Sequence, residues 1–423
     1  MAEAILPARG FRDYLPHEKV KREAVLASIR CSYAKFGFRE IETPAMEPLE
    51  RLMSNQGGEN EKLVFRVLRR GLGNDDVISV GEACDLGLRY DLTVPLVRFY
   101  ATHAHALPTV FRALQIGPVW RAERPQKGRY RQFIQCDIDI LGEASILAEV
   151  ELINATLYAL GELGVAGSTV RLNDRRILDS VLAAYEVPAE LRAKALIMID
   201  KLDKIGVDGV CSALDKAGIA ENSVASIRGL LEVVETADHS DFERMMSTLP
   251  GTCDADGIAA VREIRDAVLA SNPEGTQVAF DPSLVRGMGY YTGPIFEIAH
   301  PSSSSSICGG GRYDSMGEQL FGKKIAACGF SIGFERIVGL VDESRLAEEG
   351  GVLAIIYDGT PAKQLAMLQA RYISEGQRVL AAKRAKNLSK QLTDLGAQGV
   401  THFCVVEGDF DASSAIEVRP LTR

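Results

Sequence analysis

The clearest strand pattern in the chain follows residue 133. From residue 134 to residue 139, apolar side chains occupy the even positions and polar side chains the odd positions. A period of two is typical of a β-strand. An apolar run over residues 110–120 predicts a partner strand, and Pro125 and Gly128 mark the connection between the two. The pattern therefore predicts an antiparallel hairpin.

Elsewhere, apolar spacings typical of helices alternate with short strand-like runs. Residues 17–35, 96–103 and 145–163 are expected to form helices. Residues 174–270 are rich in Ala and Leu at helical spacing, interrupted by Pro and Gly, which predicts a helical insertion. Residues 308–314 contain three successive glycines and are expected to form a turn. Further strands are expected at residues 39–45, 170–173 and 277–281. Residues 328–336 are expected to begin as a strand.

From residue 352 onwards, strand-like and helix-like runs alternate, which predicts a small α/β domain with a mixed sheet. Its expected elements are residues 352–357, 361–374, 378–380, 388–395, 401–406 and 415–418. The whole chain is then expected to comprise a first part of a core (1–171), a helical insertion (172–275), a second part of the core (276–341), a linker (342–351) and the C-terminal domain (352–423).

Composition and charge narrow the function classes. The chain has 423 residues and a net charge of -9, so no overall basic field attracts nucleic acid, and RNA binding would need a local basic patch. Its eight cysteines form no CxxC pair, which predicts buried free thiols in a reducing cytoplasm and no metal site. The first residues are too short and interrupted for a signal peptide, and no apolar run is long enough to cross a bilayer.

Candidate chemistry lies on the hairpin. Gln135 and Asp139 are expected on one sheet face, because strand residues an even number apart point the same way. Arg121, at the end of the partner strand, could share that face and bind a carboxylate or phosphate with its forked guanidinium. The loop adds Arg124 and Gln126. The alternative for the loop residues is a solvated, charged hairpin tip.

Two further segments carry candidate polar groups. Asp91 and Thr93 flank the expected start of a helix, where acceptors either cap the helix or hold an ammonium group. Arg286 precedes Tyr290 and Tyr291, which could supply a hydroxyl and an apolar wall to a ring-shaped ligand. The alternative for the two tyrosines is a place in a β-sheet core.

Several of these segments together resemble class II aminoacyl-tRNA synthetases, and the closest likeness is to the histidyl-tRNA synthetase family. Residues 121–124 (RAER) and 128–133 (GRYRQF) resemble motif 2 of that class. Residues 17–45 resemble motif 1, and residues 328–336 (CGFSIGFER) resemble motif 3. Two more segments, the histidine-recognition motif at 284–297 and the anticodon-binding domain at 385–392, extend the likeness over almost the whole chain.

The resemblance implies an α+β class II core, with an antiparallel sheet flanked by helices, a helical insertion and a small C-terminal α/β anticodon-binding-like domain. It implies histidine--tRNA ligase activity in the cytoplasm, by a homodimer that uses L-histidine, ATP with Mg²⁺, and tRNA(His). Arg121 and Arg286 would be catalytic. The histidine-binding residues would be Asp91, Thr93, Arg121, Gln135, Asp139, Arg286, Tyr290 and Tyr291. ATP would contact Arg121, Glu123 and Arg336, and the tRNA acceptor end would contact Arg124 and Gln126.

Two departures from the family pattern keep other functions open. Gly289 stands where the family usually has Asp, which removes a carboxylate near the amino-acid pocket. The chain also ends soon after residue 418, where the anticodon-binding domain commonly continues into another helix. The alternatives are a regulatory subunit of ATP phosphoribosyltransferase in histidine biosynthesis and a paralogue that adenylates an amino acid without charging tRNA.

Overall fold

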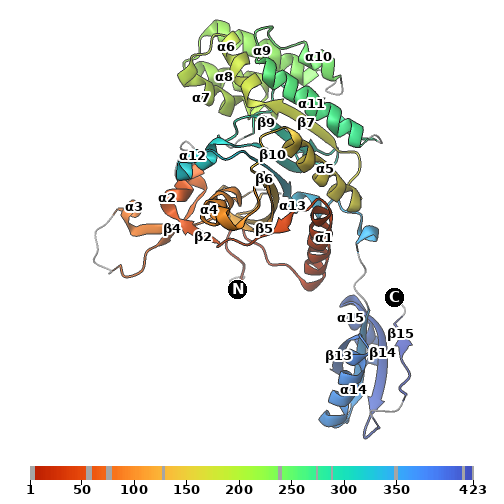
Figure 1. The fold of residues 1–423 in the computed structure, drawn as a ribbon. Helices are drawn as coiled ribbons and strands as arrows, with labels where there is room; N and C mark the ends of the chain where they lie inside the picture. The colour runs from red at the N-terminus through yellow and green to blue at the C-terminus, as the bar shows by residue number, and fades with distance from the viewer. Residues whose placement is uncertain are drawn as a thin grey trace. The chain divides into compact units, whose positions relative to one another are not determined.

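The computed structural model forms two compact units, residues 1–13 with 25–345 and residues 14–24 with 346–423 (Figure 1). Each unit is described by itself. The residues that the structure describes are 5–53, 60–72, 79–125, 129–236, 241–272, 275–286, 289–346, 351–411 and 415–421.

An eight-stranded sheet is the centre of the larger unit (Figure 1). Its strands are β1 (Arg39–Glu40), β5 (Phe111–Trp120), β6 (Gln132–Leu141), β7 (Thr169–Asp174), β8 (Gln277–Phe280), β9 (Pro294–Ala299), β10 (Cys308–Arg312) and β11 (Ala327–Gly333). The order is β1-β5-β6-β11-β10-β9-β7-β8. All neighbours from β5 to β7 pair antiparallel, and the outermost strands β1 and β8 pair parallel to β5 and β7. The predicted antiparallel class II sheet is confirmed.

The hairpin predicted from the period-two pattern is β5 and β6. Strand β6 pairs with β5 along its whole length, with Ile138 opposite Leu114 and Asp139 opposite Ala113. The apolar face is buried from residue 136 onwards: Cys136, Ile138 and Ile140 have no exposed surface. The polar side chains Gln135, Asp137 and Asp139 on the other face are buried too. Both faces of β6 are therefore inside the protein, which sets its polar side chains apart from those of a surface strand.

Helices flank the sheet, and a second, three-stranded sheet lies beside it in the same unit (Figure 1). That sheet has the order β2-β4-β3, with β2 at Met46–Pro48, β3 at Phe65–Leu68 and β4 at Cys84–Leu88. Helix α1 (Pro16–Lys35) belongs to this unit from residue 25 onwards. The other helices and 3₁₀ turns of the unit outside the segment between β7 and β8 are α2 (Leu49–Met53), η1 (Asn60–Leu63), α3 (Val80–Ala83), α4 (Thr93–His103), η2 (Ala104–Ala106), α5 (Leu147–Glu162), α12 (Ser315–Phe321), α13 (Phe334–Ile337) and η3 (Glu343–Arg345).

Two sequence predictions about strands in the larger unit were wrong. The strand expected over 39–45 is only β1, because the carbonyls of Thr43 and Pro44 accept hydrogen bonds from Arg89 instead of a neighbouring strand. The glycine-rich segment at 308–314 is not a turn but begins with strand β10. A Cβ on Gly310 would lie 2.0 Å from the carbonyl oxygen of Gly329, so only a strand of glycines fits this close to its neighbour.

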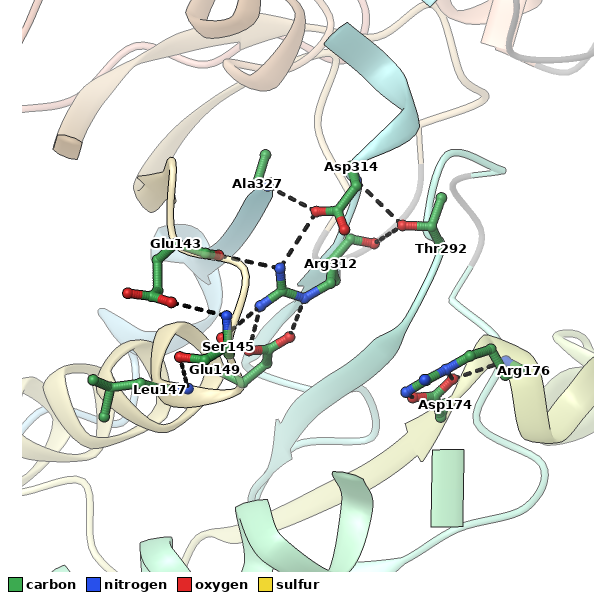
Figure 2. Close-up of polar contacts among 10 residues, drawn as sticks. All are labelled: Glu143, Ser145, Leu147, Glu149, Asp174, Arg176, Thr292, Arg312, Asp314 and Ala327. Carbon is green, nitrogen blue, oxygen red and sulfur yellow. Dashed lines mark hydrogen bonds and ion pairs between the residues drawn. The ribbon is translucent and has the colours of Figure 1, made fainter. Parts of the chain in front are cut away.

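Among the described residues, six helices lie between β7 and β8, in the segment for which the sequence predicted helices. Their helical run begins where the Asp174 carboxylate accepts a hydrogen bond from the Arg176 backbone amide (Figure 2). Figure 1 shows the helices gathered beside β7 and β9. They are α6 (Arg175–Ala184), α7 (Ala189–Ile199), α8 (Leu202–Lys216), α9 (Glu221–Thr236), α10 (Phe242–Met246) and α11 (Ala255–Ser271).

A buried ion pair fixes the end of β10. The guanidinium of Arg312 donates to both carboxylate oxygens of Glu149, at 2.6 and 2.8 Å, and to the carbonyls of Glu143 and Ser145 (Figure 2). Glu149, on the first turn of α5, has no exposed surface. A buried carboxylate is tolerated when it is fully paired in this way. The pair therefore joins α5 to the strand that runs beneath the cavity described below.

The smaller unit contains a four-stranded mixed sheet of order β13-β12-β14-β15, as predicted. Strand β12 is parallel to β13 and β14, and β15 is antiparallel to β14. Leu353 and Ile355 belong to one apolar cluster and Ala354 and Ile356 to another, so both sheet faces are covered. The strand expected at 415–418 lies further on, at β15. The elements are β12 (Val352–Asp358), α14 (Ala362–Ser374), β13 (Arg378–Lys383), α15 (Leu388–Ala397), β14 (Val400–Glu407) and β15 (Arg419–Pro420).

The cysteines are all unpaired, as predicted, but not all buried: Cys31 is exposed and Cys253 is partly exposed. Among the described residues, no helix has the length and apolar character needed to cross a membrane.

Candidate active site

A cavity of about 310 Å³ opens over strands β6, β10 and β11 of the larger unit. It brings together ten of the predicted site residues, although they come from distant parts of the sequence. The predicted residues that line it are Asp91, Thr93, Arg121, Glu123, Gln135, Asp139, Arg286, Tyr290, Tyr291 and Arg336.

The other two predicted residues are those assigned to the tRNA acceptor end. Arg124 is exposed and does not line the cavity. Gln126 lies outside the described residues. Gly289, the departure from the family pattern, is exposed and also does not line the cavity.

Four arginines line the cavity and form the guanidinium set: Arg121, Arg129, Arg286 and Arg336. Burial lowers the pKa of Arg336, and the positive charges of the other three lower it further. Arg121 donates to the carbonyl of Tyr90 at 3.0 Å, and Arg336 donates to the carbonyl of Ser306. The four positive charges repel one another, and a bound polyanion such as a triphosphate would relieve that repulsion.

Arg286 is held in an unusual conformation. Its backbone φ is +63°, a left-handed value that costs a residue other than glycine about 1–3 kcal/mol. Its guanidinium lies directly over Gly309, where a Cβ would be only 2.2 Å from the side chain. Nη1 forms an ion pair with Glu297 at 3.3 Å, whereas the buried Nε has no hydrogen-bond partner among the described residues. An unsatisfied buried donor facing a cavity is suited to a ligand oxygen.

Three acidic residues form the carboxylate set: Asp91, Asp137 and Asp139. All three are buried. Burial raises the pKa of Asp91 to about 6 and that of Asp139 to about 7, the negative charge of Asp91 adding to the rise at Asp139. Burial, and next the charge of Asp139, raise the pKa of Asp137 well above its usual value. The set would be stabilised by a bound cation.

Unpaired acceptors of this region also face the cavity. One oxygen of Asp91, Oδ1, accepts a hydrogen bond from the backbone amide of Val94 in the first turn of α4. This oxygen therefore caps the helix, one of the two roles considered for Asp91. Its other oxygen, Oδ2, is buried with no hydrogen-bond partner in the described part of the chain. Gln135 donates to Ser331 at 3.2 Å, and its Oε1 is likewise buried without a partner there. Both atoms are available to a ligand that donates hydrogen bonds.

Aromatic rings wall the carboxylate set. The rings of Tyr290 and Tyr291 are 4.8 Å apart, and Tyr313 meets Tyr290 edge-on at 5.9 Å. The Tyr313 hydroxyl donates to Asp139 at 2.6 Å and fixes the orientation of that carboxylate. The tyrosines are therefore both part of the sheet core and part of the cavity wall.

The sequence analysis missed several cavity residues. Asp137 could have been found, because it shares the alternating polar face with Gln135 and Asp139. Tyr313 and Glu335 gave no signal, since the first follows the misread glycine run and the second lies in the segment that resembles motif 3, where only Arg336 was singled out. Glu335 accepts from Arg12 at 2.9 Å, and Arg12 also donates to Tyr130 at 2.9 Å, so the N-terminal segment reaches the cavity rim.

The antiparallel sheet, its flanking helices and the arginine-lined cavity define the catalytic core of a class II aminoacyl-tRNA synthetase, an enzyme. Within that class, the family model described as Histidyl-tRNA synthetase matches residues 10–337. The chain belongs to the histidyl-tRNA synthetase family.

Relatives of known name agree with this family. A histidine--tRNA ligase of Leifsonia xyli subsp. xyli is 48% identical, with both chains covered in full. One from Porphyromonas gingivalis is 33% identical over 97% of this chain and 94% of its own. Among solved structures, a histidyl-tRNA synthetase from Nostoc sp. PCC 7120 has a TM-score of 0.74 at 24% identity, covering 96% of this chain and 92% of its own, which shows the shared fold.

Proposed function

We propose that the chain is a histidine--tRNA ligase, which activates L-histidine with ATP and transfers it to tRNA(His). The observation that supports this most directly is the convergence of the guanidinium set and the carboxylate set in one cavity. ATP and the histidine carboxylate are anionic, whereas the histidine ammonium group is cationic. One cavity with both kinds of charge suits a reaction that joins these two substrates.

In the first step, a carboxylate oxygen of histidine attacks the α-phosphorus of ATP. The new P–O bond forms as the bond to the β-phosphate oxygen breaks, giving histidyl-adenylate and pyrophosphate. Arg121 binds the substrate carboxylate and the α-phosphate, and Arg286 stabilises the charge that develops on the transferring group. Arg336 holds ATP, and Glu123, which also lines the cavity, contacts it. Such chemistry depends mainly on positioning and on fixed positive charge.

The carboxylate set and its neighbours select histidine. Asp91 and Thr93 hold the ammonium group, which satisfies the unpaired Asp91 oxygen. Gln135, Asp139 and Tyr290 orient the imidazole, and Tyr291 adds an apolar wall. Buried polar groups of this kind discriminate strongly, because a ligand without matching hydrogen bonds would leave them unpaired.

In the second step, a ribose hydroxyl at the 3′ end of tRNA attacks the activated carbonyl, and AMP leaves. The amino acid is thereby esterified to tRNA without a covalent enzyme intermediate. Arg124 and Gln126 contact the acceptor end. The exposed position of Arg124 outside the cavity supports a role with a large partner rather than with ATP.

Mg²⁺ accompanies ATP and neutralises phosphate charge when bound. In the described part of the chain, no three acidic, His or Cys side chains are grouped as a metal cage. Mg²⁺ bound with nucleotide phosphates needs only one or two protein carboxylates. Glu123 and Glu335 line the cavity and would supply them.

The working form we propose is a cytoplasmic homodimer, paired through the segment that resembles motif 1. Class II cores commonly have this closed two-fold arrangement. Sedimentation at several protein concentrations would test it: a single species of twice the chain mass is expected, and a monomer at all concentrations would contradict it.

Replacing Arg286 by Ala tests the catalytic assignment. Histidine-dependent exchange between ATP and pyrophosphate should fall at least about 10²–10³-fold, the usual cost of one transition-state contact, with the melting temperature retained. The exposed Arg228→Gln, which breaks a pair with Asp208 in the helical segment, is the control and should exchange normally. Retained exchange in Arg286→Ala would remove Arg286 from the mechanism.

The same assay separates the alternatives. Exchange followed by tRNA charging identifies a ligase, and exchange alone identifies a free-standing adenylating paralogue. Neither activity would favour the regulatory subunit. A solved chain described as an ATP phosphoribosyltransferase regulatory subunit/histidyl-tRNA synthetase from Bacillus halodurans C has a TM-score of 0.73, covering 97% of this chain and 99% of its own, but 17% identity limits that likeness to the fold. The full-length relatives favour the ligase.

A further inference from the structure

Arg286 depends on a neighbouring strand for its position. It follows strand β8, outside any strand or helix, with a left-handed backbone and a guanidinium that lies over Gly309. Its ion-pair partner is Glu297 on β9, and Glu297 is opposite Gly309 in the pairing of β9 with β10. Cross-strand partners point to the same sheet face. The contact between Glu297 and Arg286 is therefore made across the face of the sheet that lies under the cavity.

Glu297 is in turn held from the next strand. Its other oxygen is 2.9 Å from the guanidinium of Arg171 on β7, which is its direct partner in the pairing of β7 with β9. Only 6% of Glu297 is exposed, and it does not line the cavity. One buried carboxylate thus bridges two arginines, of which one is structural and one faces the substrates.

Arg171 is anchored at the far end of the row. It forms an ion pair with Asp281, which has no exposed surface and also accepts from the backbone and hydroxyl of Ser283. Asp281 directly follows β8, the strand by which the chain returns from the helical segment. A chain of ion pairs therefore runs across the sheet, from the base of that segment to the cavity. Its members are Asp281, Arg171, Glu297 and Arg286.

We propose that Glu297, fixed by Arg171 and Asp281, is the positioning residue that holds the Arg286 guanidinium against the α-phosphate. This proposal rests on the proposed function for its catalytic meaning. Glu297 does not line the cavity, so it acts through the arginines that it contacts, of which Arg286 lines the cavity. Without its charge, the guanidinium over Gly309 would lose its ion-pair partner.

The test is histidine-dependent ATP–pyrophosphate exchange by Glu297→Gln, alone and combined with Arg286→Ala. Glu297→Gln should lower kcat about 10–100-fold, as expected for misplacement of a catalytic group by about 1 Å, with each KM changed less than about threefold. In the Arg286→Ala background, the same change should cost less than about twofold, since residues that act through one contact are not additive. Arg171→Gln should lower kcat in the same way, and Glu297→Asp should restore part of the loss.

A matched control is Glu47→Gln. Glu47 is a buried carboxylate that accepts from Arg98 with both oxygens, at 2.7 and 2.8 Å, and it does not line the cavity. The Glu47→Gln variant should lose about as much stability as Glu297→Gln. At temperatures where it is folded, its kcat should equal that of the unmodified protein. Equal losses of kcat in both variants, or additive losses with Arg286→Ala, would overturn the proposal.

Crystal structures of the full chain and of Glu297→Gln give a readout that does not depend on activity. The Arg286 guanidinium should leave its place over Gly309 in the variant, and an unchanged position would overturn the proposal. Absence of histidine-dependent exchange in the unmodified protein would count against the proposed function. Normal exchange by Glu297→Gln would count against the positioning role alone.

Discussion

The guanidinium set and the carboxylate set line one cavity but are built in different ways. Asp137 and Asp139 are two residues apart on β6, and Asp91 lies two residues before α4; all three are buried. The arginines come from loops and a short helix, and the side chains of Arg286 and Arg129 remain 27% and 37% exposed. The carboxylates are therefore fixed before any ligand arrives, whereas each arginine needs a neighbour to orient it.

A glycine supports each set. Gly309 makes room for the guanidinium of Arg286, and Gly329 makes room for Asp139, whose oxygen would be 2.0 Å from a Cβ at that position. Rigid, desolvated acids suit recognition of a small, fixed amino acid. More exposed arginines suit a triphosphate, whose shape changes as the α-phosphorus reacts. We therefore expect changes in the guanidinium set to affect turnover and changes in the carboxylate set to affect histidine affinity.

The largest expected effect that would test this division is Gly309→Ala. The new methyl group would take the place of the Arg286 guanidinium and lower kcat for pyrophosphate exchange by about 10²-fold, with little change in the KM for histidine. The protein should still fold, because the clash is with a side chain that can move.

Gly310→Ala is the variant to compare with Gly309→Ala. Its Cβ would meet backbone, 2.0 Å from the Gly329 carbonyl oxygen, so this variant should fail to fold while Gly309→Ala stays folded. Circular dichroism and melting curves distinguish the two. A folded Gly309→Ala with normal kcat would show that the place of Arg286 over β10 does not matter for turnover.

A smaller effect, on the other set, is expected for Asp139→Asn. Loss of one charge-assisted hydrogen bond is worth about 1.5–3 kcal/mol, so the KM for histidine should rise about 10–100-fold while kcat changes less. Tyr313→Phe removes only the hydroxyl that orients Asp139 and should raise the same KM by a smaller factor. A loss in kcat with unchanged KM would place Asp139 with the guanidinium set.

A still smaller effect is expected from pH. The folded, ligand-free pKa of Asp139 is about 7 and that of Asp91 about 6, both above the usual value for Asp. The folded state thus binds more protons than the unfolded state between about pH 4 and pH 7, and stability should fall as pH rises through that window. A bound cation relieves this cost, so histidine affinity should rise about tenfold from pH 6 to pH 8.

Calorimetric titration with histidine at both pH values measures the effect. Because the imidazole of the ligand also titrates in this range, the comparison that counts is with Asp139→Asn. The variant should lose most of the pH dependence. An equal dependence in both proteins would mean that the ligand, and not the carboxylate set, is its source.

The two sets also differ in how far the sequence could predict them. The alternation over residues 134–139 predicted β6 and its polar face, and the start of α4 was near enough to place Asp91. These are local patterns, and the carboxylate set depends on them. Asp137 fits the same alternation but was not predicted as a site residue. The pattern was sufficient to predict it.

The surroundings of the guanidinium set are not local, and the sequence could not supply them. Successive glycines have little strand propensity, so β10 was read as a turn. The structure explains Gly309 by the Arg286 guanidinium above it and Gly310 by the Gly329 carbonyl beside it. The bridge from Arg171 to Glu297 joins residues far apart in the chain. Arg286 itself was found through the family resemblance, not through any periodicity.

The smallest effect on activity is expected for Arg124→Ala. Arg124 belongs neither to the guanidinium set nor to the carboxylate set. Arg124 is exposed beside the hairpin loop and does not line the cavity, so pyrophosphate exchange should keep its kcat and both KM values. Charging of tRNA should weaken a few-fold, mostly in the KM for tRNA, since one surface cation contributes a salt-dependent contact to phosphates. Raising the salt concentration should therefore narrow the gap between variant and unmodified protein. Slower exchange would instead mean that the loop arginine acts on ATP, and the guanidinium set would have to include a residue outside the cavity.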